Sequence, residues 1–561
     1  MGRTVSIGSQ DFATLRENHY FLVDKTLFIR EWWESADCVT LITRPRRFGK
    51  TLNMSMLECF FSNQYKDRPD LFEDLAIWQE EKYRNLQGTF PVLLLSFAGM
   101  KADELEGAKK QVKQMIAGLY EEHRYLLSGS LLSENEKSSF ARISDQMDDI
   151  DAATAIQKLC GYLYRYYGKK VILLLDEYDT PVQEAYLNGY WDFFTSYIRN
   201  FFNATFKTNP YMERALLTGI TRISKESIFS DLNNLNVVTT TSTEYERAFG
   251  FTEQEVADAL AEMGLSAQME QVKKWYDGFT FGQVRDIYNP WSITNFLDKK
   301  QFRPYWAATS SNGLVNQLIR TGSGSIKRQM ECLISGESIT VSFDEQIVYN
   351  QLEKDERAVW SLLLASGYLK VDEVEYRSEL LEPWYHLRIT NLETFSMFCT
   401  MFQGWFGTTL ESYNEFLAAL LCDDRKAMNA YMNDVALMTF GQFDTGKHPS
   451  GKSQPERFYH GFVLGLLVDL RDRYSIQSNG ESGYGRYDIM MVPKEEKDPA
   501  IVIEFKVQDP EEEEKLEDTV QAALRQIADR KYDAKLLSMG ISEKRIRHYG
   551  FAFAGKKVLI G

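Results

Sequence analysis

The stretch Val39-Thr-Leu-Ile-Thr-Arg44-Pro-Arg-Arg-Phe-Gly49-Lys50-Thr51 decides how the first part of the chain folds. The apolar run Val39–Ile42 predicts a buried strand, and the residues after Thr51 repeat their apolar positions with helical spacing. The turn between them matches the end of the phosphate-binding pattern G-x-x-x-x-G-K-[ST], but Arg44 stands in place of its first glycine. The strand before the turn and the helix after it favour a phosphate site over an ordinary basic turn.

Residues of this turn have chemical reasons to meet a nucleotide. Gly49 lets the backbone approach a phosphate, and the amides that open the following helix attract anions. Lys50 is expected to reach the β- and γ-phosphates, and Thr51 to hold Mg²⁺. The other residues expected at this site are Arg44, Arg46, Arg47, Phe48 and Leu52. The turn therefore predicts ATP and Mg²⁺ as cofactors.

A second apolar strand, Val171–Leu175, ends in two carboxylates, Asp176 and Glu177. In a parallel sheet this edge is where ligands bind. We expect Asp176 to lie on the magnesium side and Glu177 to polarise the attacking water as the catalytic base.

Two further runs, Val92–Phe97 and Ala215–Ile220, complete a set of apolar strands separated by amphipathic segments. This pattern predicts an α/β fold with a parallel sheet covered by helices on both faces. At the end of the last strand, Thr218 is expected to sense the γ-phosphate and Arg222 to neutralise it. The alternative for Arg222 is a surface arginine.

Acids and a lysine recur on predicted strands near the C-terminus. Asp488 stands near the start of one apolar run, and Ile501–Val507 carries Glu504 and Lys506. Because side chains alternate along a strand, Glu504 and Lys506 share a face and Phe505 points the other way. Two carboxylates on neighbouring strands can bind Mg²⁺ or Mn²⁺, and the lysine can position a water against a phosphodiester. An exposed strand face without function is the alternative.

Several motifs together place the chain in a known context. They are Ile7–Phe12, Leu22–Thr26, Arg44–Thr51, Asp176–Pro181, Thr218–Arg222, Trp275–Phe279, Tyr288–Ser292 and Ser366–Leu369. With these motifs the chain resembles bacterial AAA-ATPase-like proteins whose C-terminus belongs to the PD-(D/E)XK nuclease superfamily. In that family the first glycine of the phosphate loop is typically arginine, so the resemblance makes Arg44 a family trait.

The resemblance also implies further residues at the second site. Glu456, at the start of a predicted helix, is implied as a third metal ligand beside Asp488 and Glu504. Gln526 is implied to orient a metal-bound water, with Gln521 as the weaker alternative. His460 follows Glu456 by one helical turn and is interpreted as a surface or capping histidine.

Three domains are expected along the chain: 1–245 as an AAA-like P-loop ATPase, 246–445 as a helical, winged-helix-like region, and 446–561 as a restriction-endonuclease-like α/β nuclease. The middle region is predicted from the helices Glu253–Met263 and Glu356–Ala365 and the strands Tyr368–Val374 and Tyr385–Ile389. The polar stretch Asp444–Pro455 is the best linker candidate.

Composition limits the class of protein. Of 561 residues, 44% are hydrophobic and 26% charged, which excludes wholesale disorder. The six cysteines form no C-x-x-C pair, and no apolar run resembles a signal core or is long enough to span a bilayer. These features predict a cytoplasmic protein without a membrane partner.

The net charge of −16 argues against a uniformly basic nucleic-acid-binding surface. Residues 451–561, however, carry 18 Lys and Arg against 19 Asp and Glu, and Glu511–Asp518 alone contributes −5. That acidic run is expected to be a solvated loop, so a local binding groove stays possible.

The expected function is an ATP-binding and ATP-hydrolysing module coupled to a Mg²⁺-dependent nuclease, with DNA favoured over RNA as the partner. A homo-oligomer is compatible with this expectation. One alternative is a nucleotide-switched signalling ATPase whose nuclease-like domain only binds nucleic acid, and another is a scaffold that holds nucleotide as a structural ligand. Intact Lys50, Asp176 and Glu177 argue against the scaffold. Intact Asp488, Glu504 and Lys506 argue against the pure binder.

Overall fold

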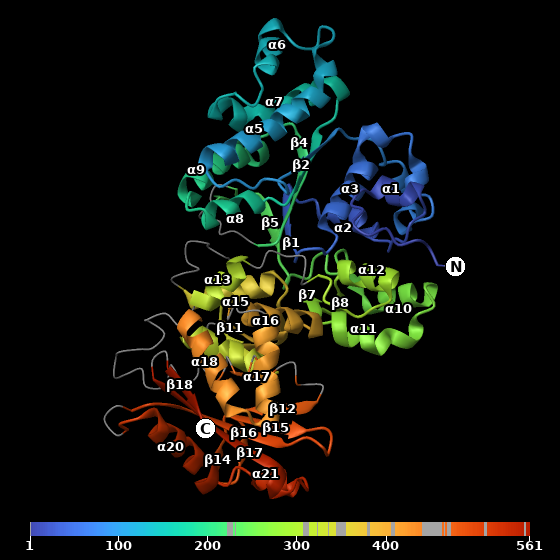
Figure 1. Cartoon of the computed structure of the whole chain (residues 1–561). Helices are drawn as coiled ribbons and strands as arrows, with labels where there is room; N and C mark the ends of the chain where they lie inside the picture. Colours follow the sequence, from blue (N-terminus) through green and yellow to red (C-terminus); the bar gives the residue numbers. More distant parts are fainter. Residues whose placement is uncertain are drawn as a thin grey trace. The chain divides into compact units, whose positions relative to one another are not determined.

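The computed structural model describes residues 2–221, 228–229, 232–306, 313–321, 324–334, 336–343, 355–377, 382–405, 410–439, 460, 463–464, 466–467, 470, 473–509, 513–554 and 557–561 (Figure 1). Contacts group the chain into two compact units, Met1–Leu318 with Thr340–Thr394, and Ile319–Ile339 with Phe395–Gly561. The limits of the three expected domains, 1–245, 246–445 and 446–561, stay a prediction.

A five-stranded sheet forms the centre of the first unit, and its strand order is β2-β3-β4-β1-β5. Its strands are β1 Val39–Thr43, β2 Val92–Ser96, β3 Val171–Asp176, β4 Met212–Gly219 and β5 Leu235–Val238. Every neighbouring pair is parallel, as expected. All residues of β1 and β3 are buried, which explains their unbroken apolar sequence.

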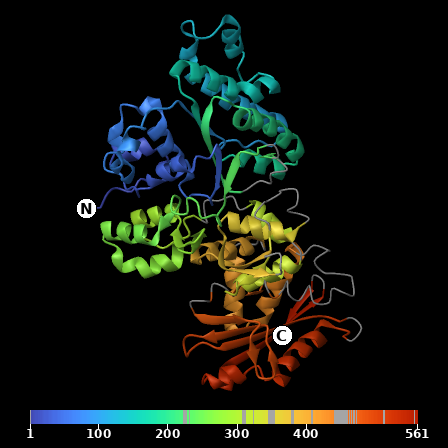
Figure 2. The same ribbon diagram turned by 180° about the vertical axis from the view of Figure 1, so that it is seen from behind.

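Helices cover both faces of this sheet, which confirms the predicted α/β class. Figures 1 and 2 show α1–α3 on one side of the sheet and α5, α7 and α9 on the other. The helices of this part are α1 Phe12–Glu17, α2 Leu27–Ser35, α3 Lys50–Phe61, α4 Glu81–Arg84, α5 Leu105–Glu122, α6 Glu134–Ala141, α7 Asp149–Tyr167, α8 Thr180–Leu187 and α9 Trp191–Phe202. Helix α3 begins directly at the phosphate loop.

Two smaller sheets complete the first unit. One has the strand order β6-β8-β7 and the other β10-β11-β9. Their strands are β6 Phe251–Thr252, β7 Phe279–Phe281, β8 Val284–Tyr288, β9 Ile339–Val341, β10 Leu369–Arg377 and β11 Glu382–Ile389. The helices between and beside them are α10 Glu253–Glu262, α11 Met269–Tyr276, α12 Pro290–Lys299, α13 Gly313–Thr321 and α15 Glu356–Ala365, whereas α14, Gly324–Ile334, belongs to the second unit. The predicted helix and two following strands correspond to α15, β10 and β11.

The second unit is built on a mixed sheet with the strand order β12-β15-β16-β17-β18. Its strands are β12 Tyr474–Ser478, β15 Ile489–Pro493, β16 Ala500–Val507, β17 Ile546–Ala554 and β18 Lys557–Ile560. Only β16 and β17 are parallel among these neighbours, and helix α20, Leu516–Asp529, connects them. A parallel pair requires such a crossover.

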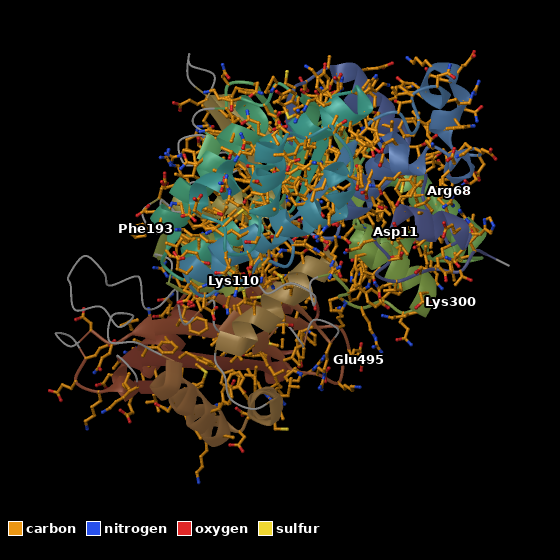
Figure 3. All side chains as sticks on the ribbon, turned by 90° about the horizontal axis from the view of Figure 1, so that it is seen from above. Asp11, Arg68, Lys110, Phe193, Lys300 and Glu495 are labelled. Atoms are coloured by element: carbon orange, nitrogen blue, oxygen red, sulfur yellow. The ribbon has the colours of Figure 1, made fainter. Side chains whose placement is uncertain are left out.

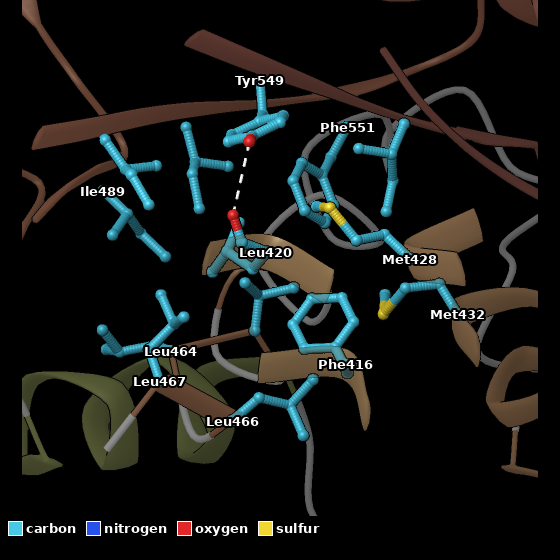
Figure 4. Packing of buried hydrophobic residues seen from close by; sticks show 14 of the residues in the cluster. Phe416, Leu420, Met428, Met432, Leu464, Leu466, Leu467, Ile489, Tyr549 and Phe551 are labelled. Atoms are coloured by element: carbon cyan, nitrogen blue, oxygen red, sulfur yellow. Dashed lines mark hydrogen bonds between the residues drawn. The ribbon is translucent and has the colours of Figure 1, made fainter. Parts of the chain in front are cut away.

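The two faces of β16 pack against different cores. Ile501, Ile503 and Phe505 join a cluster with α17, Leu410–Cys422, and α18, Arg425–Thr439. Figure 4 shows this cluster, with the Tyr549 hydroxyl donating to the Leu420 carbonyl. The alternate residues Ala500 and Val502 pack on the opposite face with side chains of α20 and α21, Ala534–Ser538. Glu504 continues this alternate series, as the strand periodicity predicts.

The acidic run Glu511–Asp518 corrects one expectation. Its last residues, Glu517 and Asp518, form the first turn of α20 rather than a loop, and Asp518 accepts a hydrogen bond from the Lys515 amide at 3.1 Å. Carboxylates at a helix N-terminus are stabilised by the unpaired amides there. Residues 511 and 512, and the linker 444–455, lie outside the described residues.

Along the part of the chain that the structure describes, no helix has both the length and the apolar character needed to cross a bilayer.

Candidate nucleotide and nuclease sites

A cavity of about 420 Å³ lies over the phosphate loop at the C-terminal edge of the five-stranded sheet. The loop residues 46–53 line it, together with Glu177 from the end of β3 and Ile220 from the end of β4. Gly49, with φ of +81°, caps α3 in the left-handed region that glycine adopts most easily. The expected nucleotide residues Arg46, Arg47 and Leu52 all border this cavity.

Lys50, which is expected to reach the phosphates of the nucleotide, is buried at the phosphate loop. Its ammonium donates to the carbonyls of Arg44 at 2.9 Å and Pro45 at 2.8 Å. Burial lowers the pKa of Lys50, while Glu177 and Asp176 oppose that shift. The carbonyl contacts hold the ammonium at the loop, where a phosphate could exchange for them.

The carboxylate of Asp176 accepts hydrogen bonds from two other residues that the sequence predicted at this site. Thr51 Oγ1 donates to Asp176 Oδ2 at 2.6 Å, and Thr218 Oγ1 donates to Asp176 Oδ1. Strand β4 lies between β1 and β3, so the tips that carry Thr218 and Asp176 are neighbours. The structure therefore brings together Thr51, Asp176 and Thr218 from segments far apart in the sequence.

Glu177 follows Asp176 with a left-handed backbone, φ of +54°. Its Oε2 accepts a hydrogen bond from Thr180 Oγ1 at 3.1 Å, and it lines the cavity. A residue of this kind in the left-handed region is uncommon and clusters at functional sites. Its role as the catalytic base stays a prediction.

The placement of Arg44 corrects the expectation that it binds nucleotide. Its buried guanidinium donates to the carbonyls of Thr43 at 2.9 Å and Thr239 at 2.7 Å, and lies 4.6 Å from the centroid of the Phe281 ring. Burial lowers the pKa of Arg44 to about 9. The side chain is absent from the cavity lining, so it ties the loop to residues beyond β5 instead.

Phe48 is likewise a packing residue, although it borders the cavity. Its ring is buried, and the Phe279 and Phe281 centroids lie 4.7 and 5.4 Å away. The Phe48 carbonyl also accepts a hydrogen bond from the Gly250 amide at 3.3 Å. These contacts anchor the phosphate loop on β7.

Helix α12 forms a wall of the cavity that sequence reasoning did not assign to nucleotide. The Arg47 guanidinium lies 4.4 Å from the Trp291 ring centroid, and Asn289 Nδ2 donates to the Arg46 carbonyl at 3.3 Å. Trp291 and Thr294 line the cavity. The signal was the Tyr288–Ser292 motif, whose aromatic residues read equally well as core.

Asp179 is a second residue whose role the sequence did not reveal. It is 2% exposed, and its Oδ2 accepts hydrogen bonds from the amides of Ile220 at 2.9 Å and Thr221 at 2.8 Å. It thereby fixes the chain just after the Thr218 strand tip. The third acid in Asp176-Glu-Tyr-Asp179 was its only sequence signal. Arg222 lies outside the described residues.

The second site lies where β15 begins beside β16. Asp488 Oδ2 accepts a hydrogen bond from the Phe505 amide at 2.8 Å, and burial raises the pKa of Asp488 to about 6. Glu504, 3% exposed, lies on the neighbouring strand. Lys506 follows it at the next position of the same face and is partly exposed. The structure thus brings Asp488 near the strand that carries Glu504 and Lys506.

Helix α20 adds Gln526 to this group. Its Nε2 contacts Glu504 Oε1 and lies 3.1 Å from the Tyr532 hydroxyl. Gln521, the alternative, is solvent-exposed on the same helix. The geometry therefore favours Gln526. The hydroxyl of Tyr532, which sequence reasoning did not single out, accepts a hydrogen bond from the Gln526 amide.

The donor set fits a hard divalent cation. Carboxylate oxygens are what Mg²⁺ and Mn²⁺ prefer, and Mg²⁺ commonly needs only one or two protein carboxylates with water completing its shell. Burial raises the pKa of Asp488 more than the Phe505 amide, Lys506 and Arg486 lower it, and a bound cation would further stabilise the charged carboxylate. Within the described residues no group of three His, Cys, Asp or Glu side chains is arranged around a metal position, and Glu456 lies outside them.

His460 is not the surface histidine that was expected. It is 4% exposed, and its Nε2 lies 3.2 Å from the Asp488 carbonyl and 3.1 Å from Ser478 Oγ. Burial lowers the pKa of His460 to about 4, so the ring is neutral at physiological pH. It holds the backbone that presents Asp488.

Two family models match the parts of the chain that contain these two sites. Residues 6–229 match the family model described as "Predicted AAA-ATPase", and residues 454–561 match the PD-(D/E)XK nuclease superfamily. The chain therefore contains an AAA-ATPase-like domain at residues 6–229 and a PD-(D/E)XK nuclease superfamily domain at residues 454–561. These two domains imply a nucleotide, a divalent metal and nucleic acid in general terms.

A relative of this chain occurs in Azotobacter chroococcum mcd 1. It is called "Uncharacterized protein in vnfD 5'region" and is 27% identical over 398 residues, which cover 70% of this chain and 68% of the relative. That name states no activity, so the chemistry has to be argued from the two sites.

Proposed function

We propose that the protein hydrolyses ATP in its AAA-ATPase-like domain and cleaves nucleic acid, DNA in preference to RNA, in a Mg²⁺-dependent reaction in its PD-(D/E)XK domain. The observation that carries this proposal is the joining of Thr51 and Thr218 to Asp176 beside the phosphate-loop cavity. Such an arrangement fits a nucleotide with its metal better than it fits an ordinary packed sheet edge.

Each residue of the first site has a place in this reaction. Lys50, Arg46 and Arg47 would neutralise the phosphates and stabilise the negative charge that develops on the departing ADP as water takes the γ-phosphoryl group. Thr51 and Asp176 would hold Mg²⁺, and Glu177 would accept a proton from, or orient, the attacking water. The aligned amides that open α3 add a further positive potential at the same place.

In the second site, Asp488 and Glu504 would hold Mg²⁺, with Mn²⁺ as an alternative. The metal would stabilise the charge that develops on the phosphodiester oxygens. Lys506 and Gln526 would position the attacking water, Gln526 through its contact with Glu504. Glu456 is retained as a proposed third ligand.

Nucleotide binding or turnover would switch the exposure or assembly of the nuclease, and a homo-oligomer would suit that role. We also retain the cytoplasm as the proposed location. Among the side chains that the structure describes, Cys38, Cys59, Cys160 and Cys422 are free thiols, as a reducing compartment favours.

A cleavage assay tests the proposal. The full-length protein is incubated with DNA and with RNA, with and without ATP, in Mg²⁺, Mn²⁺ or EDTA. The expected result is cleavage of DNA that requires a divalent cation. Binding without cleavage in every nucleotide and metal state would replace the nuclease with a nucleic-acid-binding ATPase, and absence of both would favour a scaffold.

A further inference from the structure

A short hairpin beside the second site carries an exposed tyrosine. Strands β13, Glu481–Ser482, and β14, Gly485–Arg486, pair directly, so Gly483 and Tyr484 form a two-residue turn. Gly483 has φ of +60°, and a Cβ at this position would lie 2.2 Å from the Arg530 carbonyl oxygen. Only glycine lets the hairpin pack its backbone this closely against the end of α20.

Hydrogen bonds fix this hairpin in place. The Tyr484 amide donates to the Arg530 carbonyl at 2.7 Å, and Ser482 Oγ donates to the Tyr532 carbonyl at 2.6 Å. The Tyr484 ring nevertheless remains 70% exposed, whereas Tyr487 and Tyr532 nearby are buried. An aromatic ring held in water on a rigid backbone is the feature that aromatic stacking sites share.

Positive charge surrounds the ring on the described surface. The Lys531 ammonium lies 5.6 Å from the Tyr484 ring centroid, and Arg530 and Arg486 are exposed beside it. Glu481 is the exposed carboxylate of the hairpin itself. Cations next to an exposed ring are complementary to a phosphate backbone whose bases can stack.

A chain of side-chain contacts connects this hairpin to the proposed catalytic group. Gln526 contacts Glu504 and lies 3.1 Å from the Tyr532 hydroxyl. That hydroxyl donates to the Arg486 carbonyl at 2.7 Å. The hairpin is therefore positioned by the same residues that position the candidate metal ligand, so a strand lying on one would meet the other.

We propose that Tyr484 stacks on an unpaired base of the nucleic acid held at the second site, with Lys531 and Arg530 contacting its phosphates. This rests on the proposed nuclease function and specifies its substrate as single-stranded, frayed or flapped rather than closed duplex. In a closed duplex every base is already stacked, so the ring gains nothing there. Because every base has a π-face, the contact is tolerant of sequence.

Equilibrium binding in EDTA tests the stacking contact without cleavage. The full-length protein and its Tyr484→Ala and Tyr484→Phe variants are titrated into labelled single strands and duplexes, each as DNA and as RNA. Tyr484→Ala is expected to weaken single-strand binding roughly 5- to 150-fold and duplex binding much less. Tyr484→Phe retains the ring and is expected to bind as the wild type does.

Phe193 of α9 offers a matched control, since it is 71% exposed and points outward from the first unit (Figure 3). Phe193→Ala is expected to bind both forms as the wild type does. If Tyr484→Ala binds single strands normally, or loses both forms equally, the stacking proposal is wrong while the nuclease proposal stands. If the wild type binds neither form, both proposals fail together.

Lys531→Ala tests the phosphate contact separately. It is expected to weaken single-strand and duplex binding alike and to reduce the slope of log affinity against log salt concentration by roughly one. Lys110→Ala, at an exposed position of α5, is the control (Figure 3). An unchanged salt slope in Lys531→Ala would remove Lys531 from the proposed interface.

Discussion

Single residues carry the chemistry, and Arg44 shows how far the sequence alone reaches. The motif placed Arg44 at the phosphate loop, and the loop is there, with Lys50 and Thr51 where the pattern puts them. The partners of Arg44, however, are the Thr239 carbonyl and the Phe281 ring, about two hundred residues downstream. Local sequence cannot reveal contacts between residues so far apart in the chain. The sequence pattern therefore predicted a phosphate ligand where Arg44 is a buried structural residue.

Arg44→Ala and Arg46→Ala therefore differ in what they damage. Arg44→Ala leaves buried carbonyls without their donor and opens a cavity, so we expect a loss of about 3 kcal/mol in unfolding free energy. Arg46→Ala should leave stability unchanged and weaken ATP binding. Denaturant unfolding and ATP titration of both variants measure this, and unaltered stability in Arg44→Ala would contradict the structural role.

Gln526 and Gln521 form a second pair on one helix. Gln526→Ala removes the side chain that contacts Glu504, and losing such an outer partner of a metal ligand typically costs about 10- to 100-fold in activity or metal affinity. Gln521→Ala, at an exposed position, should change neither. Metal titrations and cleavage rates compare them. Equal effects of the two substitutions would speak against the assigned site.

At the scale of helices and strands, the sequence predicts an element well where its apolar run is long. Strands β1 to β4 were predicted to within a few residues because each contains an apolar run, and every residue of β1 and β3 is buried. Strand β5, Leu235–Val238, was not predicted, because four residues interrupted by Asn236 give too short a signal. The start of α20 was read as loop, because charge composition suggested solvent exposure while helix formation depended on packing against β16 and β17.

Helix α12 allows a prediction about the wall of the nucleotide cavity. Trp291→Ala removes the ring on which Arg47 packs, and a contact of this kind contributes about 0.5–2 kcal/mol, so ATP affinity should fall several-fold. Trp384→Ala is the matched control, because Arg377 lies at the same 4.4 Å from the Trp384 ring on the β10-β11-β9 sheet. Equal ATP affinity in the two variants would show that α12 does not shape the site.

Glu58 on helix α3 is expected to make the free energy of unfolding depend on pH, separately from the nucleotide site. Burial raises the pKa of Glu58 to about 7, with Glu122 and Asp11 adding repulsion. The folded state therefore disfavours charged Glu58, and this destabilisation grows as pH rises from the ordinary pKa of 4.5 to above 7.

Glu58→Gln should accordingly stabilise the protein by about 1–3 kcal/mol at pH 8 and by little near pH 4.5. Glu73→Gln, at an exposed position, is the control and should show no pH-dependent difference. Denaturant unfolding at both pH values measures the effect. A gain that is the same at both pH values would contradict the raised pKa.

At the scale of the whole molecule, the sequence located two chemical centres, one in each compact unit. The resemblance and the family matches agree on both, and the acidic total of −16 excludes only a uniformly basic surface. The boundaries between parts were harder to predict, because residues 246–306 pack on the phosphate loop through Phe279, Phe281 and Trp291. Contacts of this kind are decided by the folded core and leave no composition change in the sequence.

A substitution that inactivates one of the two centres should leave the activity of the other centre intact. Lys50→Ala is expected to reduce ATP turnover at least about a hundredfold, because it removes the charge that meets the phosphates. Asp488→Ala is expected to abolish nucleic-acid cleavage and leave ATP turnover within about twofold, since Asp488 and the residues that line the nucleotide cavity belong to different compact units.

The most direct measurement follows ATP hydrolysis and metal-dependent cleavage of nucleic acid in the same preparations of wild type, Lys50→Ala and Asp488→Ala. Wild type is expected to show both activities, and Asp488→Ala ATP hydrolysis alone. Metal-dependent cleavage that persists in Asp488→Ala would contradict the assignment of the nuclease centre.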